Sequence, residues 1–380
     1  MKVLFNASTL VKGGALQVAT AFIRHALNDK GGVDWHFALS KEVVRELAKG
    51  ELAQLDACST VFEISPSRSK SARNKLTDLQ VSLGSDVVFT LFGPAYVEFK
   101  GPHVLGVADG WVTHSNWLAF HALGSVQSAV RMALTIVYKA FWFRKANVWV
   151  VEANNAKQGL IDRLKIMPES IHVVSNTCSQ FYRNRPVEGC IPKKGEKIRL
   201  ICLSAYYRSK NLEIIPEVAR HILDIDAQLD FEFVITLPTD DYGLKGIIGK
   251  AKSLGVEKHI CNIGPVRVSE GADVYESCHI AFLPSLLETF SANYPEAMAM
   301  KKPIVTTDLG FARDACKDAA LYYSPRNAKS AAENIVKLAD DPITWKRLVD
   351  CGSRVLEGLP TPERRFDRYV DIIKACHAGK

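Results

Sequence analysis

Residues 282–308 read FLPSLLETFSANYPEAMAMKKPIVTTD, and this stretch decides the fold that we expect. It begins with the end of an apolar strand, passes through Pro284-Ser285 and a loop holding Glu288, and continues into a helix beginning near Pro295. A second apolar strand starts at Ile304. Strand, helix and strand in this order form the unit from which parallel α/β sheets are built.

The same alternation continues on both sides of this stretch. Short apolar, β-branched runs in the first half occur at Val3–Asn6, Trp35–Leu39, Val61–Ile64, Val87–Leu91, His103–Val107, Val148–Val151 and His172–Val174. A second series follows at Arg199–Leu203, Phe231–Leu237, Ile260–Ile263, Ile280–Leu283, Ile304–Thr307 and Leu321–Tyr323. Helix-like segments such as Leu212–Ile222 and Ala328–Ala339 separate the runs. We therefore predict an α/β protein with two doubly wound parallel sheets, and a ligand cleft between their carboxyl ends.

The chain has 380 residues, 47% of them hydrophobic, which is enough for two domains of ordinary size. Residues 183–197 are rich in proline, glycine and charge without an apolar period, as in an exposed connection. We expect a first domain over residues 1–182, a linker over 183–197 and a second domain over 198–360. Residues 361–380 open with helix-start signals, and we expect a closing helix with a possible return to the first domain.

Charge and cysteine content narrow the class of protein. The formal net charge is +7, and most of the basic excess lies in the first half, which suits an anionic partner. Nine cysteines, never arranged as CxxC, disfavour a disulfide framework and a zinc site and favour a reducing cytosol. No apolar run is long enough to span a bilayer, and no secretory leader or nucleic-acid-binding motif is recognisable. We expect a cytoplasmic protein without a nucleic-acid partner.

Glu288 and Glu296 flank the turn from strand to helix in the opening stretch. Each carboxylate can accept hydrogen bonds from two adjacent hydroxyls of a ribose or a hexose. The unpaired N–H groups near the helix start favour a diphosphate between them. A plainer interpretation is that Glu296 is an acid in an ordinary first helical turn and Glu288 a solvated loop residue.

The segment PSLLETF…YPEAMAMKKPIVTTD resembles the E-x7-E signature of family 4 retaining glycosyltransferases, which have the GT-B fold of two Rossmann-like domains. The resemblance continues in order through four further segments, which read HVVSNTCSQFY, ICLSAYYRSKNLEII, HICNIGPV and LGFARDACKDAALYYSP. It covers residues 147–348. The first half matches only in its opening strand and glycine turn.

The resemblance implies a role for each acidic residue of the turn. Glu296 would bind the ribose hydroxyls, and Glu288 the hydroxyls of the transferred sugar. Lys210 would neutralise the leaving diphosphate, a task for which fixed positive charge in a closed site is suited. The alternative for Lys210 is a solvated turn lysine. The main chain that would bind the diphosphate or sugar lies at Phe290, Ser291 and Ala292.

Other donor-binding positions follow from the same resemblance. Ser204 lies in the matched first turn, and Val266 in the segment that lines the base pocket. Many family members carry a second phosphate-binding arginine where this chain has Ala205. Arg208, in the same turn, is a candidate replacement.

In the first half, Lys12-Gly13-Gly14 follows the opening strand and precedes a helix. Gly13 and Gly14 match a family glycine pair, and glycines let the main chain approach a ligand closely. Asp109 follows an apolar strand where the family often has His-Asp. It would orient an acceptor hydroxyl or take its proton; a cap for the next turn is an equal alternative. His103 and His114 are nearby alternatives for this role, and a structural role is favoured for each.

Two basic segments have open interpretations. Residues 126–143 combine Arg131 and Lys139 with apolar and aromatic residues. This pattern is typical of a core helix or of a helix at a membrane surface, and we favour the core helix. Arg68, Lys70, Arg73 and Lys75 lie in a serine-rich stretch expected to be a loop, either solvated or in contact with an anionic acceptor.

The resemblance implies transfer of a sugar, with retention, from a UDP-sugar or GDP-sugar to a glycan or lipid-linked acceptor, in bacterial-type surface glycan or glycoconjugate synthesis. Contact with the inner face of the membrane stays open, as the less favoured interpretation of residues 126–143. The nucleotide sugar is a co-substrate; no tightly bound cofactor and no metal are expected, and Asp224-Ile225-Asp226 is interpreted as a helix end. The alternatives are a catalytically silent GT-B protein that binds a glycan or stabilises a partner, and a sugar-nucleotide epimerase.

Overall fold

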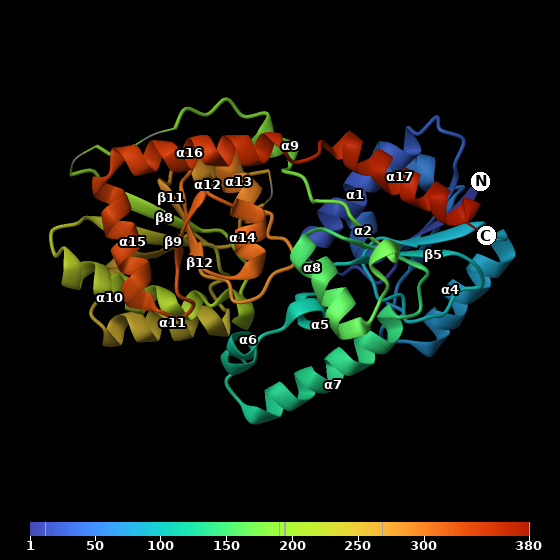
Figure 1. Cartoon of the computed structure of the whole chain (residues 1–380), viewed down its shortest axis with the longest axis horizontal. Helices are drawn as coiled ribbons and strands as arrows, with labels where there is room; N and C mark the ends of the chain where they lie inside the picture. Colours follow the sequence, from blue (N-terminus) through green and yellow to red (C-terminus); the bar gives the residue numbers. More distant parts are fainter. Residues whose placement is uncertain (12, 190, 194, 268, 380) are drawn as a thin grey trace. The chain divides into compact units, whose positions relative to one another are not determined.

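A computed structural model describes the chain except for residues 12, 190, 194, 268 and 380 (Figure 1). The chain divides into two compact units. The first contains Met1–His114, Val130–Asn176 and Pro360–Lys380, and the second contains Ser115–Ala129 and Thr177–Leu359. Lys12 of the predicted glycine turn and Cys190 lie outside the described residues.

The first unit is built on a seven-stranded sheet in the order β3-β2-β1-β4-β5-β6-β7, with every neighbouring pair parallel. The strands are β1 Lys2–Ala7, β2 Asp34–Ser40, β3 Ser59–Phe62, β4 Val87–Thr90, β5 His103–Val107, β6 Val148–Val151 and β7 Ile171–Val173. Each lies at an apolar run of the sequence. The central strand β1 is buried from Val3 to Ala7, as expected for a parallel strand covered on both faces.

Helices cover this sheet on both sides. Their bounds are α1 Gly14–Leu27, α2 Lys41–Arg45, α3 Lys49–Leu55, α4 Lys70–Leu83, α5 Gly110–His114, α8 Asn154–Gly159 and α17 Pro362–Ala378, with shorter turns η1 Leu160–Leu164 and η2 Pro168–Ser170. The closing helix α17 packs beside α1 (Figure 1). The ring of Phe22 on α1 stacks on Phe5 at 4.6 Å and meets Phe366 on α17 at 5.0 Å. The last residues thus complete the core of the first unit.

The second unit contains a six-stranded parallel sheet in the order β10-β9-β8-β11-β12-β13. The strands are β8 Ile198–Cys202, β9 Phe231–Ile235, β10 Ile260–Asn262, β11 Ile280–Leu283, β12 Ile304–Thr307 and β13 Ala320–Tyr323. Side chains alternate between two cores: Leu200 packs in the core with α10 and α15, whereas Ile201 packs in the core with α13 and α14. The prediction of two doubly wound parallel sheets is confirmed.

The helices of the second unit are α6 Trp117–Ala122, α9 Gln180–Arg183, α10 Ile215–Ile225, α11 Tyr242–Ser253, α12 Gly271–Glu276, α13 Asn293–Ala299, α14 Gly310–Cys316, α15 Ala328–Asp340 and α16 Pro342–Glu357. Three 3₁₀ turns accompany them, namely η3 Arg208–Lys210, η4 Leu212–Ile214 and η5 Glu257–His259. Helix α13 begins two residues before the predicted Pro295.

Helix α7, Val126–Phe143, has its first four residues in the second unit and the rest in the first. The favoured interpretation as a core helix is wrong for most of its length, because Phe143 is the one residue of α7 that is buried. Its exposed apolar side chains are spaced along one helical face at Val126, Val130, Leu134, Val137, Tyr138 and Phe141. We call these six residues the α7 stripe. No helix among the described residues is long and apolar enough to cross a membrane.

Candidate active site

The loop after β11 is fixed by side chains from neighbouring segments. The hydroxyl of Thr306 donates to the carbonyl of Leu283 at 2.7 Å, and that of Thr307 donates to Ser285 at 2.6 Å. Asn211, which has a positive φ of 55°, donates its amide N–H to the Pro284 carbonyl at 3.3 Å. A loop held at successive carbonyls presents the following residues, including Glu288, in a defined position.

Lys210 and Glu288 meet at this loop although 78 positions separate them in the sequence. The Lys210 ammonium donates to Glu288 Oε1, which also accepts a hydrogen bond from the Ser285 hydroxyl at 3.0 Å. The two side chains are 19% and 14% exposed, so solvent still reaches the pair. The backbone N–H of Leu286 donates to the Ser209 carbonyl at 2.7 Å, which joins the turn carrying Lys210 to the loop carrying Glu288.

Glu296 lies in the first turn of α13 and is only 9% exposed. Burial raises the pKa of its carboxyl to about 7, an effect that the nearby charge of Lys210 only partly offsets. Within the described part of the chain, no side chain donates a hydrogen bond to this carboxylate. Hydrogen-bond donors from a bound ligand would therefore stabilise the charged form of this carboxyl.

Tyr182, Tyr275 and Cys178 lie close enough to the Glu296 carboxyl for its charge to act on them. Burial, and next the charge of Glu296, raise the pKa values of Tyr182 and Tyr275, and the same causes raise that of Cys178 to about 12. All three side chains thus stay neutral beside Glu296. Sequence reasoning missed this lining, because the three residues come from separate segments with no common motif.

The main chain at Phe290, Ser291 and Ala292 lies directly before α13. The carbonyls of Ser291 and Ala292 accept from the N–H groups of Tyr294 and Glu296 at 3.2 and 3.0 Å. The N–H groups of residues 290–292 donate to no group in the described residues. They leave a short row of donors next to the Lys210–Glu288 pair, which suits an anionic or hydroxyl-rich ligand.

The remaining predicted donor residues occupy the carboxyl ends of the strands. Ser204 follows β8 and donates its N–H to Thr236 Oγ1 at 3.1 Å. Val266 follows β10 and is half-buried. Arg208 pairs with Glu213 at 3.1 Å, and its guanidinium lies 5.8 Å from the centre of the Tyr242 ring. Its suggested role at a phosphate stays a prediction.

Gly13 and Gly14 lie in the first unit, where Gly14 is the first residue of α1. Gly13 has φ of 75° and ψ of −166°, a backbone conformation that only glycine adopts without strain. A Cβ at either position would meet no atom within 4 Å. The conformation of the turn, rather than crowding, therefore requires a glycine at position 13.

Asp109, at the end of β5, is held by two interactions within the first unit. Its Oδ1 accepts from the N–H of Val112 at 3.3 Å, which confirms the cap interpretation, and its Oδ2 accepts from the Lys139 ammonium at 2.7 Å. Burial lowers the pKa of Lys139, but Asp109 more than offsets this and raises it. An acceptor role for Asp109 stays a prediction. His103 is structural as expected: burial lowers its pKa to about 4, and it bonds to Thr90.

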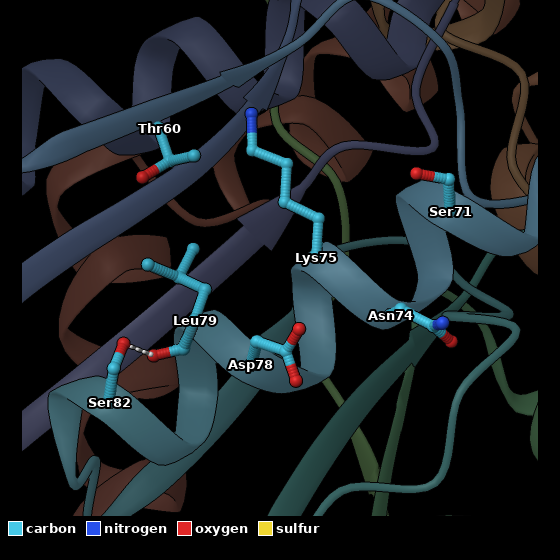
Figure 2. A pocket seen from close by; sticks show the side chains of 7 residues that line it. All are labelled: Thr60, Ser71, Asn74, Lys75, Asp78, Leu79 and Ser82. Atoms are coloured by element: carbon cyan, nitrogen blue, oxygen red, sulfur yellow. Dashed lines mark hydrogen bonds between the residues drawn. The ribbon is translucent and has the colours of Figure 1, made fainter.

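The basic run 68–75 is not the expected loop, because Lys70–Leu83 forms helix α4, which Ser69 caps. The buried residues Ala72, Leu76 and Gln80 recur at helical spacing and explain the error. Figure 2 shows an open pocket between α4 and β3, lined by Thr60, Ser71, Asn74, Lys75, Asp78, Leu79 and Ser82. The Lys75 ammonium donates to the Val61 carbonyl at 3.0 Å, and none of the predicted donor-site residues lines the pocket.

The segment that carries this loop, Lys210 and the two glutamates is similar to known proteins. Residues 190–354 match the family of group 1 glycosyl transferases. No curated protein matches the chain.

Solved structures resemble the chain over its whole length. A glycosyltransferase from Rickettsia africae is 15% identical, with a TM-score of 0.72 and coverage of 100% of this chain and 99% of that one. Anabaena HepE in complex with UDP and glucose is 15% identical, with a TM-score of 0.71 over 99% and 100%. S. aureus TarM, bound to UDP and α-GlcNAc-glycerol among other ligands, is 11% identical, with a TM-score of 0.66 over 98% and 99%. These likenesses show that the fold is GT-B.

Proposed function

We propose that this protein is a retaining glycosyltransferase that moves a sugar from a nucleotide diphosphate sugar, with UDP as the favoured nucleotide, to a hydroxyl acceptor. The observation that carries the proposal is the meeting of Lys210 with Glu288 beside the buried Glu296, within the segment that matches the glycosyl transferases. UDP is favoured because the structurally similar HepE and TarM are each described with it.

In this proposal, two hydroxyls of the ribose donate to the Glu296 carboxylate and replace the solvent that burial removes. The N–H groups of residues 290–292 and the Lys210 ammonium face the diphosphate. Glu288 accepts from hydroxyls of the sugar and shares Lys210 with the leaving group. Charge builds up on the diphosphate as its bond to the sugar breaks, and the fixed cation stabilises that charge most strongly in the transition state.

The acceptor oxygen then bonds to the sugar on the face that the diphosphate leaves, and the hydroxyl proton passes to the departing diphosphate, so no side chain is required as a nucleophile. Lys210 supplies the positive charge, and the proposal includes neither a metal nor a tightly bound cofactor. Asp109, already paired with Lys139, is the candidate in the first unit to orient the acceptor.

The proposed acceptor is a glycan or a lipid-linked glycan. Contact with a membrane surface is also part of the proposal, because the α7 stripe exposes large apolar side chains to solvent. Asp109 is the one acidic residue in 101–150, so the helix suits an anionic surface at the cytoplasmic face. Vesicles of phosphatidylglycerol should sediment the wild-type protein, and Leu134→Glu should abolish this. Equal binding of Leu134→Glu and the wild type would contradict the contact.

Thermal-shift measurements with UDP, GDP, ADP and their glucose conjugates test the donor site. At least one should raise the melting temperature of the wild type. Lys210→Ala and Glu288→Ala should reduce that rise, and the exposed Lys245→Ala serves as the matched control. If no nucleotide stabilises the wild type, the proposed function is wrong. Slow hydrolysis of the bound donor would further exclude a catalytically silent protein.

A further inference from the structure

Residues 115–129 connect two segments of the first unit in the sequence, yet they belong to the second unit. Helix α6 lies within this stretch and packs against η3, the turn that carries Lys210. His121 on α6 is also hydrogen-bonded to Arg326 of the second unit. A segment from the first half of the sequence is therefore a built-in part of the site that holds Lys210 and Glu288.

Asn116 makes the closest connection between this segment and the loop after β11. Its side-chain N–H donates to the Leu286 carbonyl at 2.9 Å, and its Oδ1 accepts from the N–H of Ala119 at 2.9 Å, where it caps α6. These two bonds fix which way the amide points, since the reverse orientation would place oxygen against oxygen. Asn116 is thus both a helix cap and a clamp on the loop.

The bond from Asn116 is the last of four side-chain hydrogen bonds to successive carbonyls of the loop. The carbonyls of residues 283–286 each accept one side-chain hydrogen bond, and the donors are Thr306, Asn211, Thr307 and Asn116. Three of these donors lie in or beside the second sheet. The fourth, Asn116, holds the carbonyl of Leu286, whose N–H is bonded to Ser209 next to Lys210. Leu286 is completely buried and lies two residues before Glu288.

We propose that Asn116 is a positioning residue: by holding the Leu286 carbonyl, it sets the place of Glu288 relative to Lys210, and it makes the donor site depend on the segment 115–129. Without this hydrogen bond, the Leu286 carbonyl is left without its donor, and the loop between Ser285 and Glu288 gains freedom. The expected effect of Asn116 on nucleotide binding rests on the proposed function, whereas its expected effect on the order of the loop does not.

Two substitutions separate the clamp from the cap. Asn116→Asp keeps an oxygen for the Ala119 N–H but replaces the amide donor with a carboxylate oxygen facing the Leu286 carbonyl. Asn116→Ser also keeps a capping oxygen and is too short to reach Leu286. The matched control is Asn327→Asp, because Asn327 caps α15 by accepting from the Ser330 N–H at 3.0 Å and makes no bond to the loop.

Amide hydrogen exchange followed by mass spectrometry tests the clamp without any ligand. In Asn116→Asp and Asn116→Ser, exchange in the peptide containing Leu286 should accelerate by about fivefold, the factor that one lost hydrogen bond of about 1 kcal/mol produces. Asn327→Asp should leave that peptide unchanged. Unchanged exchange in both Asn116 variants would overturn the proposal.

The second readout is the Kd of whichever of UDP-glucose, GDP-glucose and ADP-glucose stabilises the wild type most, because Glu288 is proposed to hold the sugar. It should rise by about fivefold in both Asn116 variants and stay at the wild-type value in Asn327→Asp. Faster exchange with an unchanged Kd would overturn the positioning role. If the wild type binds none of the three sugar nucleotides, the proposed function fails while the exchange result still decides whether Asn116 orders the loop.

Discussion

The buried acid Glu296 should make the protein less stable at alkaline pH, and Glu296→Gln should remove this dependence. Glu296 has a pKa of about 7 in the fold, raised from 4.5 by burial. Between these two values the folded protein binds more protons than the unfolded chain, so the free energy of unfolding falls as the pH rises. The stabilising contribution is complete below pH 4.5 and is lost as the pH rises through 7.

The size of the effect follows from the difference in pKa. Each pKa unit corresponds to 1.36 kcal/mol, so the shift from 4.5 to about 7 amounts to about 3 kcal/mol. Glutamine has nearly the same shape and no charge. The free energy of unfolding of Glu296→Gln, relative to that of the wild type, should therefore be about 2.5 kcal/mol higher at pH 8 than at pH 5.

Urea unfolding of both proteins at pH 5 and pH 8 gives this difference directly. Comparing the change between the two pH values cancels any constant effect of placing an amide in the site. If the difference between variant and wild type is the same at both pH values, Glu296 is not ionising in a buried environment and the reasoning is refuted. Nucleotide affinity should depend on pH in the opposite direction from stability. Because ribose hydroxyls donate to the charged carboxylate, affinity should increase as the pH rises through 7.

Three further substitutions test other parts of the structure by urea unfolding. Glu152 and Arg365 form a buried pair at 3.0 Å, so Glu152→Ala should cost about 3–5 kcal/mol, and a loss below 1 kcal/mol would show that Arg365 needs no partner. Gly13→Ala should lower the free energy of unfolding by about 1–3 kcal/mol, because alanine is strained in the backbone conformation of residue 13. Gly14→Ala, at the start of α1, should change it by less than about 0.5 kcal/mol. Equal effects of the two substitutions would contradict this reasoning. Asp109→Asn should cost about 1–3 kcal/mol by leaving Lys139 without its carboxylate, and unchanged stability would show that the pair contributes nothing.

The strands and the turn bearing Glu288 could be predicted from the sequence because their signals are local. Parallel strands covered on both faces are short apolar runs, and β11 and β12 have the bounds predicted for them. The start of α13 was predicted to within two residues. Local sequence also predicted the helix at residues 126–143.

What local sequence did not determine is the environment of each element. The apolar residues of α7 have the same spacing whether they face a core or solvent, and only the fold shows that Leu134 is exposed. The pairing of Asp109 with Lys139 and the contact of Arg208 with Tyr242 depend on tertiary packing. Residues 115–129 carry no compositional mark of belonging to the second unit, so the bond from Asn116 to Leu286 could not be predicted.

The most direct test of the central claim is the release of nucleoside diphosphate from the sugar nucleotide that the wild type binds. The rate should be measured for the wild type, Lys210→Ala, Glu288→Ala and the control Lys245→Ala. If Lys210 and Glu288 hold the leaving diphosphate and the sugar, each of these two variants should lose about 100-fold or more in rate, and the control should keep the wild-type rate. Wild-type turnover by Lys210→Ala and Glu288→Ala would contradict the assignment of this loop as the donor site.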